Sequence, residues 1–144
     1  MIEAMIVVAV VGILAAIALP SFLDSIRKSH RSDAFAALAT VQQAQERWRG
    51  NRNTYAGNDL LTVARPDGLG LDATSSKGYY TLSIDAAEAS GYTATATAVS
   101  GTSQASDGTC QRLRVRIAAG NIHYGSSGAS GEFDESSTNR CWVR

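Results

Sequence analysis

A single carboxylate, Glu3, stands at the start of a long apolar segment of this 144-residue chain. Every residue from Ala4 to Leu19 is apolar or glycine, so a charge beside them is costly unless a cation pairs with it. An acidic residue also suits the first turn of a helix, where the macrodipole is positive. The residue types leave two roles open for Glu3: a charge at a helix start, or one half of an ion pair with another molecule.

Two cysteines, Cys110 and Cys141, are the residues in the second half of the chain whose chemistry is most specific. They can either form a disulfide or remain as two buried thiols. Pairing is favoured in an exported protein, where it would close a loop of about 30 residues.

Arg112, Arg114 and Arg116 alternate with three aliphatic residues. Since successive side chains of a strand point to opposite faces, one face would be core and the other a row of guanidinium groups. With Arg140 and Arg144 this row is a candidate DNA or anion patch; the alternative is an ordinary solvated strand face. The formal net charge is +0, so attraction to DNA must come from a patch and not from a net field.

The sequence predicts no enzyme, no cofactor and no metal site. His30 and His123 are isolated, and the chain contains no Gly-x-Ser-x-Gly elbow, phosphate-binding loop or Cys-x-x-Cys pair. Glu132, Asp134 and Glu135 lie in a Gly/Ser-rich stretch that is more typical of a solvated surface than of a calcium site.

The elements that position these residues begin with a helix in two halves. Residues 1–23 form an apolar half about 35 Å long, enough to cross a membrane; a signal peptide or a buried core helix fits this segment less well. Residues 24–52 predict an amphipathic half that packs on a head. Gly12 and Pro20, both in the apolar half, are the weak points of the helix, and we expect a kink or local melting at Pro20. The core-facing stripe comprises Ala34, Leu38, Val41, Gln45 and Trp48.

Residues 53–144 predict a globular β head. Its first part, residues 53–78, is rich in Gly, Asp, Asn and Ser and reads as a connecting loop with little regular structure. Alternating patterns then predict strands at 80–84, 92–99 and 112–117, with a short fourth strand at 122–124. The fold class is therefore α+β, with a long amino-terminal helix packed on an antiparallel sheet of three to four strands, and with a disulfide loop at 110–141.

The amino terminus resembles that of type IV pilins in the run Ile2–Pro20, IEAMIVVAVVGILAAIALP, with its hydrophobic-Ile-Glu opening and its closing Ala-Ile-Ala-hydrophobic-Pro. A carboxyl-terminal disulfide loop is similar to the one that pilins carry, and the pair Cys141-Trp142 resembles minor pilins of the PilE type. The resemblance implies the type IV pilin fold. It also implies that Glu3 pairs with the methylated amino terminus of a neighbouring subunit.

The same resemblance implies a structural subunit, a minor pilin, of a bacterial type IV pilus that supports pilus biogenesis, twitching motility or adhesion. Its implied partners are other pilin subunits, the inner-membrane assembly platform and the prepilin peptidase, which would act on a precursor whose basic leader we expect before Met1. The implied location is the inner membrane, with the head in the periplasm, and then the extracellular pilus. The alternatives are a DNA-binding pilin for DNA uptake and a pseudopilin of type II secretion.

Overall fold

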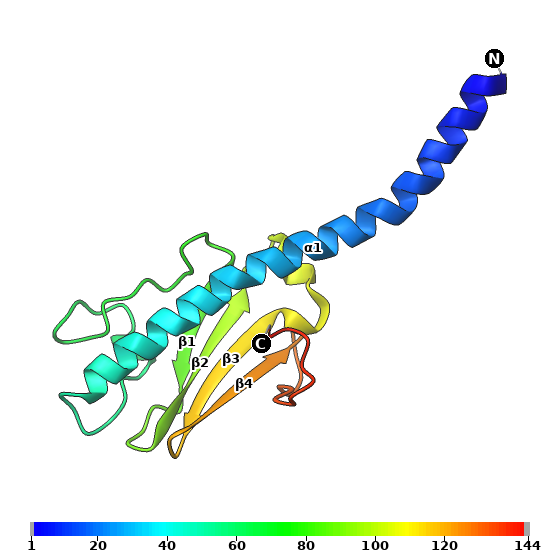
Figure 1. The fold of residues 1–144 in the computed structure, drawn as a ribbon. Helices are drawn as coiled ribbons and strands as arrows, with labels where there is room; N and C mark the ends of the chain where they lie inside the picture. The colour runs from blue at the N-terminus through cyan, green and yellow to red at the C-terminus, as the bar shows by residue number, and fades with distance from the viewer. Residues whose placement is uncertain (1, 143–144) are drawn as a thin grey trace.

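The computed structural model describes residues 2–142 and has one long helix lying across one four-stranded sheet (Figure 1). The helix α1, Ile2–Arg49, has 48 residues, which corresponds to about 72 Å at 1.5 Å per residue. Its amino-terminal half projects away from the head, and its carboxyl-terminal half covers the sheet. Arg47 and Arg49 in the last turn suit the negative end of the helix dipole.

Pro20 does not interrupt α1. The helix continues through this residue, and Figure 1 shows it curving between its free end and the head. A proline removes one backbone hydrogen bond and bends the helix, so curvature is the expected consequence. In this structure the predicted kink takes the form of a bend without melting.

The sheet is an antiparallel meander of β1 (Tyr80–Asp85), β2 (Gly91–Ala98), β3 (Arg112–Ala118) and β4 (Asn121–Ser127), in that spatial order. The α+β prediction is confirmed, with the fourth strand longer than expected. The face toward α1 carries the alternating residues that the pattern predicted, and β2 contributes small ones, Ala94 and Ala96, both fully buried. Small side chains beneath α1 let the helix lie close to the sheet.

The core takes its helical residues only from the second half of α1. Ala34, Leu38, Val41 and Ala44 are buried among aliphatic and aromatic residues of β1 to β3. Gln45, which belongs to the same stripe, is also fully buried. Its amide donates to the carbonyl of Ala56 at 2.7 Å and accepts from the Ala56 amide at 2.9 Å, so its polar atoms are satisfied inside the core.

The connecting loop predicted at 53–78 has little regular structure, as expected, but part of it is buried. Ala56, Leu61 and Leu69 from this segment are each no more than 2% exposed and belong to the core. The segment has one short 3₁₀ helix, Asn58–Leu60, and its backbone folds back on itself through the amide of Leu69 donating to the carbonyl of Leu60. The composition of the segment is that of a loop, and it gave no sign that these three apolar residues pack in the core.

The carboxyl-terminal loop is held at both of its ends. Cys110 and Cys141 form the predicted disulfide, with a Cα–Cα distance of 5.5 Å. The next residue, Trp142, stacks on Phe35 of α1 at 4.8 Å between ring centroids, and its indole donates to the carbonyl of Gly125 at 2.8 Å. The disulfide and the indole together attach the end of the chain to both α1 and β4.

Removing the disulfide should destabilise the head without changing its fold. In Cys110→Ser/Cys141→Ser the unfolded chain regains the freedom of a 31-residue separation, so the free energy of unfolding should fall by about 3–4 kcal/mol. Urea denaturation of the oxidised chain and of the variant measures this difference. A loss below about 1 kcal/mol would contradict the role assigned to the bridge.

Candidate functional site

The first candidate site is the apolar half of α1, defined here as residues 2–23, because every residue of it is exposed. Its 18-residue window of mean hydropathy 2.7 has 0% of its residues buried by the rest of the chain. Glu3, Gly12 and Pro20 all lie in this half, and a Cβ at Gly12 would meet nothing within 4 Å. Apolar side chains exposed over this length require lipid or other protein around them.

The second candidate is the arginine row of β3, and the structure shows that one carboxylate, that of Glu135, pairs with two of its three arginines. Arg114 donates to Glu135 at 2.6 Å, and Arg116 donates to the other carboxylate oxygen of Glu135 at 2.5 Å. Arg112 donates instead to the carbonyls of Gly128 and Gly131. Phe133 lies under the guanidinium groups of Arg112 and Arg114, at 4.8 and 3.9 Å from its ring centroid.

Glu135 therefore acts as the counter-ion of the row. The hydrogen bond from Arg116 is the main cause that holds the pKa of Glu135 below its ordinary value, and Arg114 adds to the effect. The other two residues of the predicted patch do not join the row by any contact that the structure describes: Arg140 lines a hollow beside α1, and Arg144 lies outside the described residues.

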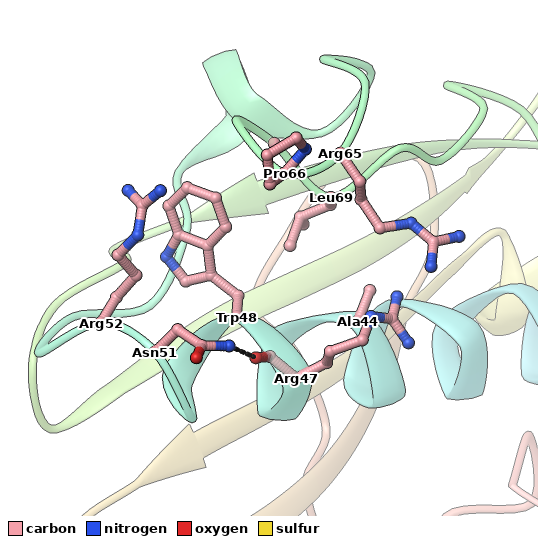
Figure 2. A pocket seen from close by; sticks show the side chains of 9 residues that line it. Ala44, Arg47, Trp48, Asn51, Arg52, Arg65, Pro66 and Leu69 are labelled. Carbon is pink, nitrogen blue, oxygen red and sulfur yellow. Dashed lines mark hydrogen bonds between the residues drawn. The ribbon is translucent and has the colours of Figure 1, made fainter.

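A third candidate is a cationic pocket at the carboxyl-terminal end of α1, with a volume of about 400 Å³. Figure 2 shows Trp48 between the helix and Pro66, with Arg52 on one side and with Arg47 and Arg65 on the other. The guanidinium of Arg52 lies 4.2 Å from the centroid of Trp48. The full lining is Ala44, Arg47, Trp48, Asn51, Arg52, Arg65, Pro66, Gly68 and Leu69.

The pocket has the chemistry of an anion site with an apolar floor. Three of its lining residues carry a guanidinium, and among the residues that the structure describes no carboxylate lines it. The indole Nε1 of Trp48 is buried and has no hydrogen-bond partner in the described part of the chain. Guanidinium groups around an aromatic ring suit a ligand that combines phosphate oxygens with a flat apolar part.

Comparison with known proteins identifies the family of this chain. A family model described as "Type IV minor pilin ComP, DNA uptake sequence receptor" matches residues 20–114. The chain belongs to the type IV pilin family. The type IV major pilin protein PilE1 of Neisseria gonorrhoeae is similar to it, at 34% identity over 87 residues; the match covers 60% of this chain and 38% of that relative. This pilin therefore spans well under half of the relative's length.

The family predicted from the amino terminus is thus confirmed, and so is the disulfide of this pilin. Type IV pilins are structural proteins, which agrees with the expectation that the chain is no enzyme. The sequence did not predict the pocket of Figure 2, because Trp48 was assigned to the core-facing stripe of the helix. The signal that could have found it is local: Arg47, Arg49 and Arg52 surround a tryptophan within six residues.

Titration of Glu135 tests whether its carboxylate is the counter-ion of the arginine row. The pKa of Glu135 in the folded pilin should lie below the ordinary value, because Arg116 and Arg114 favour the charged carboxylate. The pairing therefore stabilises the loop at pH values above the pKa that Glu135 has in the unfolded chain. This stabilisation is lost as the pH falls through the lower pKa of Glu135 in the folded pilin. Side-chain carboxyl resonances measured by NMR against pH give the midpoint.

Arg116→Gln should raise that midpoint toward the ordinary range of a glutamate. Arg112→Gln is the matched control, because Arg112 binds backbone carbonyls and makes no described contact with Glu135. An unchanged midpoint in Arg116→Gln would show that Glu135 is not the counter-ion of the row.

Proposed function

We propose that this pilin is a structural subunit, of the minor class, of a bacterial type IV pilus, assembled through the apolar half of α1. The observation that carries the proposal is the contrast within one helix. Residues 2–23 are all exposed, whereas from Asp33 onward the same helix buries one face against a head that has its own core and its own disulfide. The head needs no partner to fold, and the apolar half needs one to be buried.

Two environments satisfy that need. Before assembly the apolar half crosses the inner membrane with the head in the periplasm, since about 20 apolar residues match the thickness of the hydrocarbon core. After assembly it packs among the same helices of neighbouring subunits, in an extracellular filament. The prepilin peptidase and the inner-membrane assembly platform are the partners that this path requires. Gly12 and Pro20 are the positions at which the helix adapts to its neighbours.

Glu3 sets the register of that packing. A carboxylate among apolar helices must be paired with a cation, and the amino terminus of a neighbouring subunit supplies one. A subunit that entered out of register would leave the charge unpaired, at a cost of several kcal/mol. The family model begins at residue 20, so this role rests on the exposed placement of Glu3 and on the resemblance of the amino terminus to pilins.

Glu3→Ala, made in the full-length precursor, should abolish incorporation into pili and leave the head folded. Pili sheared from cells and probed by immunoblot measure incorporation, and disulfide formation in the membrane fraction reports the fold. Glu132→Ala is the matched control, because Glu132 is an exposed head glutamate that makes no described hydrogen bond. Normal amounts of the Glu3→Ala subunit in sheared pili would refute the assigned role.

DNA capture is a second candidate function, and the cationic pocket of Figure 2 favours it. The matching family model is described as a DNA uptake sequence receptor, and it covers Arg47, Arg52 and Arg65. These guanidinium groups have no carboxylate among the described lining residues, unlike Arg114 and Arg116 on β3. Phosphate contacts of DNA would fall on the three arginines, with Trp48 as an aromatic surface between them.

Gel shifts of the full-length pilin in detergent with duplex DNA test this function. Arg52→Gln should weaken binding and lower the dependence of log affinity on log salt by about one for the lost phosphate contact. Lys77→Gln is the charge-matched control, since Lys77 is an exposed cation outside the pocket. No retardation by the wild-type protein at low salt, or equal affinity of the two variants, would remove this candidate.

A further inference from the structure

A second cationic hollow lies beside α1 where the apolar half meets the head. It has a volume of about 790 Å³ and is bounded by α1 and by the backbone around the 3₁₀ helix Gly108–Cys110. The charged residues of its lining are Arg27, Lys28, Arg31 and Arg140, with Asp24 and Asp107. Four of these residues are cationic and two are carboxylates, so the hollow is positive by two charges.

The two carboxylates leave two of the cations unengaged. Asp107 accepts two hydrogen bonds from Arg31, both at 2.7 Å, and the two side chains are only 6% and 14% exposed, so this pair is structural. Asp24 pairs with Arg27 at 3.0 Å at the surface. Lys28 and Arg140 are exposed and form no ion pair with any described residue, and the buried Nε of Arg27 has no partner there either.

The hollow lies at a defined depth relative to the apolar half. Ser21 is still inside that half, and Lys28 follows its last residue, Leu23, by five positions, or about 7.5 Å along the helix. A bilayer of about 40–45 Å with a hydrocarbon core of about 30 Å has headgroup layers of about 5–8 Å on each side. With residues 2–23 in the hydrocarbon, the unengaged cations stand at the level of lipid phosphates.

We propose that this hollow binds the phosphodiester headgroup of an anionic phospholipid while the pilin is held in the membrane. The inference rests on the membrane-inserted state of the proposed function. Lys28 and Arg140 contact the phosphate, and the hydroxyl groups of Ser21, Ser106 and Thr109 suit a hydroxyl-bearing headgroup such as glycerol.

The disulfide gives the hollow its far wall. Cys110 lines the hollow, and its bond to Cys141 holds the neighbouring Arg140 in the same lining as Lys28 of α1. One cation thus comes from the membrane-proximal helix and the other from the end of the chain, 112 positions later. The disulfide therefore positions a lipid ligand in addition to stabilising the head.

Titration of the full-length pilin in zwitterionic detergent with phosphatidylglycerol, followed by native mass spectrometry, measures the binding. Lys28→Gln/Arg140→Gln should raise the apparent dissociation constant by about fivefold for each charge removed, because a cation near an anionic lipid surface contributes about 1 kcal/mol. Lys77→Gln/Arg49→Gln removes the same number of charges outside the hollow and should bind as the wild type does. Phosphatidylcholine, whose choline compensates the phosphate charge, should bind the wild type more weakly.

Equal phosphatidylglycerol binding by the two double variants would overturn the proposal, as would equal binding of the two lipids by the wild type. Displacement of the lipid by millimolar inorganic phosphate would show a free-phosphate site instead, and would also overturn it. Insertion is measured separately by alkaline extraction of vesicles that contain the pilin. Extraction of the wild type would count against the membrane-inserted state itself, whereas retention without lipid preference would count only against the hollow.

Discussion

The apolar half of α1 must be covered, and the chain itself does not cover it. All of residues 2–23 are exposed, and the first buried residue of the helix is Asp33. At about 25 cal/mol per Å² of apolar surface, leaving some 20 such residues in water would cost more than the few kcal/mol by which a small domain is stable. The head can therefore have a complete core while the apolar half of α1 is still uncovered. Lipid or neighbouring helices must complete it, and exchange between these two environments is the physical basis of a subunit that is stored and then assembled.

If the apolar half of α1 moves between environments, the head must stay attached to the packed half of the helix. Polar contacts at both ends of the packed half hold it there. At the membrane end, Arg31 is bound to Asp107 through two hydrogen bonds, and the nearby Gln104 donates to the hydroxyl of Tyr80, whose pKa is raised by burial. At the other end, Gln45 is bonded to the backbone of Ala56. Breaking either set leaves buried polar groups unpaired, which costs more than the bonds contribute when made. The head therefore cannot slide along α1.

The sequence predicted those features that repeat with a period, and missed those that depend on a single distant contact. The four strands and the helical stripe follow from alternation and from spacings of three and four, and the disulfide follows from export. Leu61 and Leu69 were missed because isolated apolar residues among turn formers have no period. The arginine row was located correctly on one face of β3. The ion pairs of the row depend on Glu135, which lies about 20 residues further along the chain in an irregular loop. No local sequence pattern reveals such a partner.

The placement of charge explains how a chain with a formal net charge of +0 could meet two different anions. Glu135 pairs with Arg114 and Arg116 on the outer face of the sheet and offsets one of the three arginine charges there, which weakens the attraction of this face for a polyanion. Other cations without a described carboxylate partner lie near the two ends of the packed half of α1: Lys28 and Arg140 beside the apolar half, and Arg47, Arg52 and Arg65 around the carboxyl-terminal end of the helix. Lys28 and Arg47 are 19 residues apart on α1, or about 28 Å. This separation exceeds a Debye length of about 8 Å at physiological salt, so the two sites are electrostatically independent. In the two proposals above, a lipid headgroup occupies one site and DNA phosphates occupy the other, so assembly would release the lipid without changing the distal pocket.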